Sequence, residues 1–147
     1  MKLIIMRHGQ ASWFAPSDKE RELTEQGVRE VRDTVALLAA QRVGCVFASP
    51  YLRAQQTAHI AAEAFGLRVA TLDELEPDGN PAQVLDALPD SGVVLLASHM
   101  PIVSYLAGLL CDGTPKVGPS FQTGMALVLE ADILAPGMGR VIERIIP

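Results

Sequence analysis

Three observations predict that this sequence adopts an α/β fold with parallel strands. Short apolar runs alternate with segments of helical periodicity, an order that right-handed βαβ connections convert into parallel strands. The most apolar run, residues 93–97, is typical of a central strand covered on both faces. The length of 147 residues, 49% of them apolar, fits a single domain over residues 1–147 with a sizeable core.

Residues 3–6 form the first predicted strand, a short apolar run that is followed directly by Arg7 and His8. Gly9 then allows the chain to turn off the sheet or to approach a ligand closely. Residues 11–22 mix aromatic, charged and proline residues without a clear period, which predicts a loop near the end of this strand.

A helix is predicted after this loop, with Thr24 as its N-cap. Its sheet-facing side chains recur at helical spacing: Val28, Val31, Val35 and Leu38. Residues 45–48 form the second strand candidate. Ser49-Pro50 follows as the predicted N-cap and first residue of a helix that continues to about Phe65 and ends at Gly66.

The second half of the chain repeats this alternation. The predicted elements are a strand at 68–71, a loop at 72–79, a helix from Asn80-Pro81 to about Leu88, a strand at 93–97 and a helix from Pro101 through Leu110. A loop rich in proline and glycine follows. Two alternating segments, 125–130 and 140–146, flank a turn at Pro136-Gly137 and predict a closing hairpin.

The charge and cysteine content exclude some classes of protein. A net charge of −5 without clustered Lys or Arg argues against nucleic acid as a partner. The N-terminus lacks the apolar core of a signal peptide, and no run approaches the roughly 20 residues that span a membrane. We therefore expect a cytoplasmic protein. We also expect a monomer. Cys45 and Cys111 are typical of buried thiols in a reducing compartment, although their spacing alone leaves a disulfide open.

Four basic residues lie at or just beyond the ends of three predicted strands: Arg7, His8, Arg53 and His99. Parallel strands bring their carboxyl ends to one edge of a sheet, so we expect these side chains to meet in one pocket. Guanidinium groups match phosphate oxygens, and the predicted helix N-termini beside Ser49 and His99 add backbone N–H groups. A phosphoryl site is favoured over a metal site, because adjacent arginines repel a cation and no third ligand is evident.

The imidazole of His8 is the predicted nucleophile of this pocket. Neutral His8 would attack phosphorus in line while Arg7, Arg53 and His99 stabilise charge on the equatorial oxygens. Water would then hydrolyse the phosphohistidine, and no metal or other cofactor is expected to be needed.

The candidate residues lie in three blocks of sequence: Met6-Arg7-His8-Gly9, Ser49-Pro50-Tyr51-Leu52-Arg53-Ala54-Gln55-Gln56-Thr57-Ala58 and Ser98-His99-Met100-Pro101. Together these blocks resemble the histidine phosphatase superfamily, which has the phosphoglycerate mutase-like fold. The short length, Arg21-Glu22-Leu23-Thr24, Glu74-Leu75 and the helix from Tyr105-Leu106 to Cys111 resemble the SixA-type phosphohistidine phosphatases in particular. The resemblance implies a three-layer α/β/α sandwich whose mostly parallel sheet contains one antiparallel strand.

The resemblance also implies a phosphatase that acts on phosphohistidine in a signalling protein, with a role for each matching residue. His8 would be the phosphorylated nucleophile, with Arg7, Arg53 and His99 binding the phosphoryl group. Arg21 is either a further oxyanion contact or a solvated loop charge. Glu74 is the candidate proton donor, or a solvated loop acid, since phosphoimidazole can leave already protonated.

Two other functions remain open at this stage. One is hydrolysis of a small phosphate monoester with Glu74 as general acid. The other is a non-catalytic module that binds phosphate or a phosphoprotein. Trp13 and Phe14 either pack within their loop or form a docking lip for a protein substrate, whereas His59 is expected to be structural.

Overall fold

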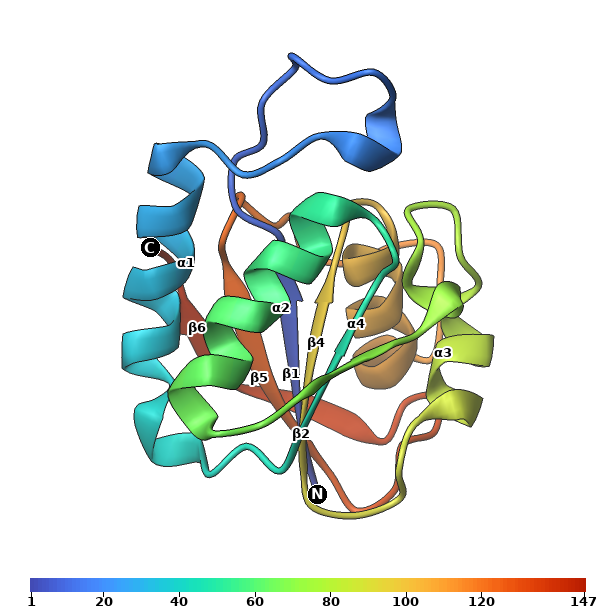
Figure 1. The fold of residues 1–147 in the computed structure, drawn as a ribbon. Coiled ribbons are helices and arrows are strands. Elements are labelled where there is room, and N and C mark those ends of the chain that lie inside the picture. The colour runs from blue at the N-terminus through green and yellow to red at the C-terminus, as the bar shows by residue number, and fades with distance from the viewer.

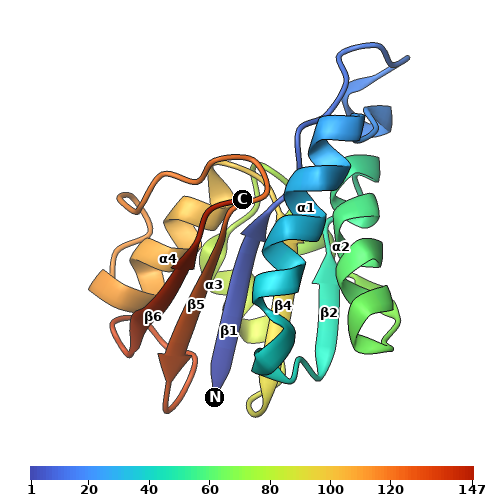
Figure 2. The ribbon, with the colours of Figure 1, turned by 90° about the vertical axis from the view of Figure 1, so that its left-hand side faces the viewer.

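A computed structural model describes residues 1–147, and its centre is a six-stranded sheet with helices on both faces (Figures 1 and 2). The strands are β1 (Lys2–Arg7), β2 (Cys45–Ala48), β3 (Val69–Thr71), β4 (Val93–Ser98), β5 (Ala126–Ala131) and β6 (Gly139–Ile145). Their order in the sheet is β3-β2-β4-β1-β5-β6. Only β5 runs antiparallel to its neighbours, which confirms the predicted sheet with one antiparallel strand.

Two hydrophobic cores lie on opposite faces of this sheet. Alternate residues of β1 point to opposite faces, as the period of a strand requires. Leu3 and Ile5 join the core under α3 (Pro81–Ala87) and α4 (Ile102–Asp112). Ile4 and Met6 join the core under α1 (Glu25–Leu37) and α2 (Leu52–Phe65). The three-layer arrangement is therefore confirmed.

Most predicted helix ends agree with the structure. The Thr24 hydroxyl accepts a hydrogen bond from the Gly27 N–H at the start of α1. Asn80 caps α3 in the same way through the Ala82 N–H. Gly66 ends α2 with a positive φ of 68°, a conformation that glycine adopts without steric cost. The predicted loops at 11–22 and 72–79 each contain a single turn of 3-10 helix, at Asp18–Glu20 and Asp73–Leu75.

The predicted start of α2 at Ser49-Pro50 is wrong. The helix begins at Leu52, with Tyr51 at the N-cap position. The Ser49 hydroxyl instead accepts a hydrogen bond from the Tyr51 N–H at 3.2 Å and lies 2.7 Å from Nε2 of His99. Ser49 therefore links two strand ends across the sheet, a role that the local pattern could not reveal.

Gly9 turns the chain toward α1. A Cβ at this position would lie 2.5 Å from the carbonyl oxygen of Gly27, which is too close for any side chain. The tight approach expected of Gly9 is therefore to the backbone of α1 rather than to a ligand. This contact sets how the segment after β1 leaves the sheet.

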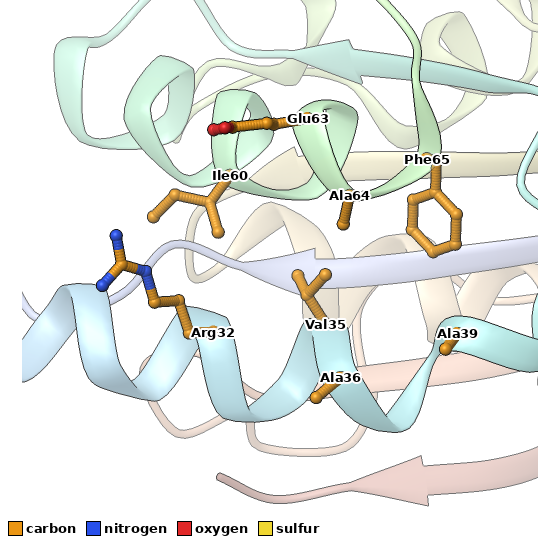
Figure 3. A pocket seen from close by; sticks show the side chains of 8 residues that line it. All are labelled: Arg32, Val35, Ala36, Ala39, Ile60, Glu63, Ala64 and Phe65. Atoms are coloured by element: carbon orange, nitrogen blue, oxygen red, sulfur yellow. The ribbon is translucent and has the colours of Figure 1, made fainter.

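A groove lies between α1 and α2 on one face of the sheet (Figure 3). It has a volume of about 460 Å³ and is lined mainly by apolar side chains such as Val35, Ile60 and Phe65. Arg32 and Glu63 are its only charged lining residues. We call it the α1–α2 groove.

The sequence also predicted buried cysteine thiols and no segment long enough to span a membrane. Cys45 and Cys111 are free thiols and are partly buried. None of the helices combines the length and the apolar character needed to cross a membrane.

Candidate active site

A pocket of about 370 Å³ opens at the carboxyl edge of the sheet and contains five of the six residues singled out from the sequence. They are Arg7, His8, Arg21, Arg53 and His99. The ring centroids of His8 and His99 are 5.1 Å apart. Segments far apart in the sequence thus bring two imidazoles and three guanidinium groups together.

The ends of β1 and β4 position the two histidines. These strands are parallel neighbours, with Arg7 in register with Ser98. The His8 N–H donates to the carbonyl of Ser98 at 2.9 Å, so the residues after both strands stay aligned. Arg53 reaches the same place from the first turn of α2 and is 5% exposed.

The hydrogen bonds of His8 determine which ring nitrogen carries the proton. Nδ1 lies 2.7 Å from the carbonyl oxygen of Gly9, which can only accept, so Nδ1 must carry the hydrogen. Nε2 accepts from Nε of Arg53 at 3.3 Å. The neutral ring therefore keeps its lone pair on Nε2, the atom available for nucleophilic attack.

Burial keeps His8 and His99 neutral at pH 7. Desolvation, followed by the positive charges of Arg53 and Arg7, lowers the pKa of His8 to about 4 despite the hydrogen bond to Gly9. Desolvation, followed by His8 and Arg53, lowers the pKa of His99 to about 3. A bound anion would oppose the effect of the arginine charges, so this pocket is electrostatically suited to an oxyanion.

Two buried polar atoms of the pocket residues have no hydrogen-bond partner: Nε of Arg7 and Nδ1 of His99. The other ends of these side chains are fixed, since Nη1 of Arg7 donates to the carbonyl of Phe121 at 2.8 Å and Nε2 of His99 contacts Ser49. Burial also lowers the pKa of Arg7. Unpaired buried polar atoms are rare in native proteins and call for a partner such as an ion or water.

Asp18 connects two of the arginines and was not predicted from the sequence. Its carboxylate lies 3.2 Å from Arg21 and 3.2 Å from Arg53, and its carbonyl accepts from Nη1 of Arg53 at 2.6 Å. Desolvation acts to raise the pKa of Asp18, but the hydrogen bonds and charges of Arg21 and Arg53 outweigh it and lower the pKa. Asp18 is therefore ionised at neutral pH and competes with an incoming anion for the same donors.

Tyr51 was also not predicted as a site residue, although it lies two residues before Arg53 in the sequence. Its ring centroid is 4.9 Å from that of His99, and the guanidinium carbon of Arg53 lies 5.1 Å from the centre of the Tyr51 ring. Arg21 three residues after Asp18 was the only sequence signal for that carboxylate. The sequence signal for Tyr51 was its place in the block that contains Arg53, from which no role for Tyr51 was predicted.

Arg21 supports the loop and also faces the pocket. Its Nε donates to the carbonyl of Ser12 at 2.9 Å, and a terminal nitrogen donates to the carbonyl of Ala11 at 3.3 Å. Its guanidinium carbon lies 3.7 Å from the centre of the Trp13 ring. With Asp18 these contacts occupy three of its five N–H groups and leave two for a ligand.

Glu74 does not line this pocket. It lies in a separate cleft with three other acids of the same segment, Asp73, Glu76 and Asp78. Pro77 is the residue of this segment that reaches the pocket wall. The structure therefore does not bring Glu74 together with the other five predicted site residues.

Trp13 and Phe14 are held on the outside of the molecule. Their side chains are 81% and 96% exposed, so packing of Phe14 within the loop, one of the two alternatives, is wrong. Trp13 lines the pocket, whereas Phe14 does not.

Comparisons with known proteins agree with this arrangement. Residues 3–77 match the profile described as the Histidine phosphatase superfamily (branch 1). The chain is 41% identical to phosphohistidine phosphatase SixA of Escherichia coli (strain K12) over 132 residues, which covers 84% of this chain and 81% of the relative. It is 34% identical to the SixA homolog of Haemophilus influenzae over 126 residues, which covers 75% of this chain and 77% of that protein.

A solved structure is similar along the whole chain. The protein histidine phosphatase SixA complexed with tungstate superimposes with a TM-score of 0.86 at 32% sequence identity. The match covers 100% of this chain and 97% of that one. The sequence and structural comparisons therefore point to the same group of proteins.

Proposed function

This chain belongs to the histidine phosphatase superfamily, and from that premise we propose that it hydrolyses phosphohistidine on a protein through a covalent intermediate at His8. The observation that carries the proposal is the pocket itself, where neutral His8 lies beside guanidinium groups and unpaired polar atoms. The relatives that carry the name phosphohistidine phosphatase support the substrate class. The tungstate bound to the similar SixA structure supports an oxyanion as ligand.

The proposed first step is attack by Nε2 of His8 on phosphorus. The bond from phosphorus to the substrate imidazole breaks, and its electron pair returns to that nitrogen. The other nitrogen of the substrate ring carries a proton, so the leaving group departs as neutral imidazole. Arg7, Arg53, Arg21 and His99 bind the transferring oxygens, whose charge is spread in the transition state. Because Nδ1 of His8 is fixed by Gly9, the ring does not have to reorient before attack.

The proposed second step is hydrolysis of phosphorylated His8. Water attacks phosphorus, the bond to Nε2 breaks, and inorganic phosphate and a proton leave. The cationic side chains supply the charge stabilisation in both steps, and the proposal assigns no role to a metal ion or other cofactor.

The two other functions considered from the sequence have less support. An alkyl phosphate ester needs an acid for its leaving group, and Glu74 lies outside the pocket. Asp18 is inside the pocket, but its pKa is lowered, so it is not a neutral acid at pH 7. A non-catalytic binding module would not require the Nε2 lone pair that the contacts of His8 provide.

The proposal extends to location and assembly. Free, partly buried cysteines suit a reducing compartment, which supports the cytoplasm. A monomer is proposed as the active unit, because a single chain already supplies every side chain that the proposed mechanism uses. A net charge of −5 supports a protein partner over nucleic acid.

The test is transfer of labelled phosphate from a chemically phosphorylated histidine-containing domain. We expect release of inorganic phosphate and a transient, acid-labile label on His8. The His8→Ala variant should give neither, whereas His59→Ala, which alters an exposed histidine outside the pocket, should give both. Retained turnover in His8→Ala would rule out the covalent route, and hydrolysis of small esters alone would rule out the substrate class.

A further inference from the structure

The segment between β1 and α1 rises above the carboxyl edge of the sheet (Figures 1 and 2). It carries the two most exposed aromatic side chains of the protein, Trp13 and Phe14, at 81% and 96% exposed. Neighbouring large apolar side chains on a surface are a mark of an interaction site. Here they also lie beside the proposed catalytic pocket, because Trp13 forms part of its wall.

Hydrogen bonds hold this segment in a defined shape. Ala11 and Leu23 form an antiparallel bridge, and the Ser12 N–H donates to the carbonyl of Glu22 at 2.8 Å. The Phe14 N–H donates to the Ser12 hydroxyl at 3.1 Å. The backbone around Phe14 is therefore fixed, and its ring points outward from a pre-organised support.

The support is tied to the catalytic residues. Arg21 donates to the carbonyls of Ala11 and Ser12 and stacks on Trp13, and Arg53 donates to the carbonyl of Asp18. The exposed rings therefore have a fixed position relative to the pocket. A molecule that places its phosphoryl group between these arginines therefore lies next to Trp13, which lines the same pocket.

Resting on the proposed function, we propose that Trp13 and Phe14 form a docking lip for the phosphohistidine-bearing protein and bind an apolar surface next to its phosphorylated residue. A free phosphate or a single phosphohistidine fits within the pocket and does not need Phe14, which lies outside the lining. Only a larger substrate can reach that ring. The occupant is apolar because the exposed ring of Phe14 offers no hydrogen-bonding group.

The size of the lip agrees with a transient encounter. Two aromatic side chains bury about 150–250 Å² each when fully covered. Even with the pocket rim, the contact stays in the size range of weak, short-lived complexes, below about 1,200 Å² in total. A phosphatase must release its dephosphorylated partner, so a small apolar contact beside a strong anion site suits turnover.

The experiment compares a protein substrate with a small one. We would measure kcat/KM of the wild type and Phe14→Ala on a chemically phosphorylated histidine-containing domain and on phosphoimidazole. We expect Phe14→Ala to lower kcat/KM on the protein about 10-fold, through KM, and to change it less than about twofold on phosphoimidazole. Ile133→Ala removes another exposed side chain, 57% exposed and outside the pocket, and should leave both substrates unaffected.

A pair of phosphohistidine peptides tests the chemistry of the occupant. One peptide has leucines beside the phosphohistidine and the other has serines at the same positions. The wild type should prefer the leucine peptide about 10-fold, and Phe14→Ala should lose that preference. Sedimentation of both proteins accompanies the assay, since a Phe14-dependent dimer would assign the lip to a second copy of the chain and overturn the proposal.

The remaining outcomes separate this inference from the proposed function. Equal protein turnover by the wild type and Phe14→Ala overturns the docking lip and leaves phosphohistidine hydrolysis intact. Equal losses on the domain and on phosphoimidazole also overturn it, because the effect would then lie in the pocket. A wild type that hydrolyses small esters and no phosphohistidine overturns both.

Discussion

The proposed catalytic pocket and the α1–α2 groove lie in one small molecule and have opposite character. The groove is larger, at about 460 Å³ against 370 Å³, and is mainly apolar. The pocket concentrates three arginines and two histidines, and Nε of Arg7 and Nδ1 of His99 have no partner. The proposed active site is therefore distinguished from the groove by its converging charges and unpaired polar atoms, and not by a larger volume or a more apolar lining.

The difference has an origin in the architecture. The groove lies where α1 and α2 pack against one another above the sheet, so its lining comes from helix faces already selected for apolar side chains. The pocket lies where β1 and β4 end and the chain leaves the sheet. At that point, polar groups of residues such as His8 and His99 can face a ligand although the residues are buried.

Arginines from the two hollows should respond very differently to removal, and this gives the largest expected effect. Arg53→Ala should lower kcat on phosphoimidazole about 100-fold or more, because it removes charge stabilisation beside the proposed nucleophile His8. Arg32→Ala, in the groove, should stay within about twofold of the wild type. Steady-state kinetics on both purified variants measures the contrast. Similar losses in the two variants would remove the distinction between pocket and groove.

A substitution in the α1–α2 groove should lower the stability of the protein and leave its activity unchanged. Val35 is 5% exposed and packs in the core under α1 and α2, so Val35→Ala should lower the free energy of unfolding by about 2 kcal/mol. Urea denaturation followed by circular dichroism measures this loss. The folded fraction should keep the wild-type kcat, because Val35 lies in the groove and not in the pocket. A lower kcat with unchanged stability would contradict the assignment.

The protonation state of His8 as a function of pH tests the electrostatic character of the pocket. A ring with an ordinary pKa of about 6.5 would be about 90% protonated at pH 5.5. The pKa of His8 is lowered to about 4, chiefly by burial, so we expect His8 to remain the neutral Nδ1–H tautomer from pH 7.5 to 5.5. Ring-nitrogen NMR of the phosphate-free protein reports this state directly, and a midpoint between pH 6 and 7 would contradict it.

The same shift has a consequence for stability. Between pH 6.5 and about 4 the unfolded chain binds a proton at this histidine and the folded chain does not. His8 therefore contributes a loss of stability as the pH falls through that range. His99, whose pKa is lowered to about 3, adds a loss of the same sign.

The smallest expected effect belongs to Glu74. Because its side chain lies in a cleft apart from the pocket, Glu74→Gln should change kcat on phosphoimidazole less than about twofold. The same variant should be assayed on an alkyl phosphate ester. A selective loss of 10-fold or more on the ester would restore Glu74 as a general acid and favour the ester phosphatase.

The sequence by itself determined the elements and where the basic residues lie along them. Apolar runs of strand length and helical periodicity are local properties, so β1, α1, β4 and the closing hairpin could be predicted closely. The rule for parallel sheets then predicted that Arg7, at the end of β1, would share one edge of the sheet with His8 and His99 just beyond the ends of β1 and β4. These predictions depend on the spacing of apolar residues along the chain, which can be read from neighbouring residues alone.

Only the tertiary structure decided how side chains from different segments pair. Ser49 contacts His99 instead of capping a helix, and Asp18 forms ion pairs with both Arg21 and Arg53. Glu74 lies in a different cleft. The hydrogen bond from Nδ1 of His8 to Gly9, which keeps the ring's lone pair on Nε2, likewise depends on the rotamer and packing of His8. Such contacts depend on distances between atoms remote in the sequence, and no local pattern encodes them.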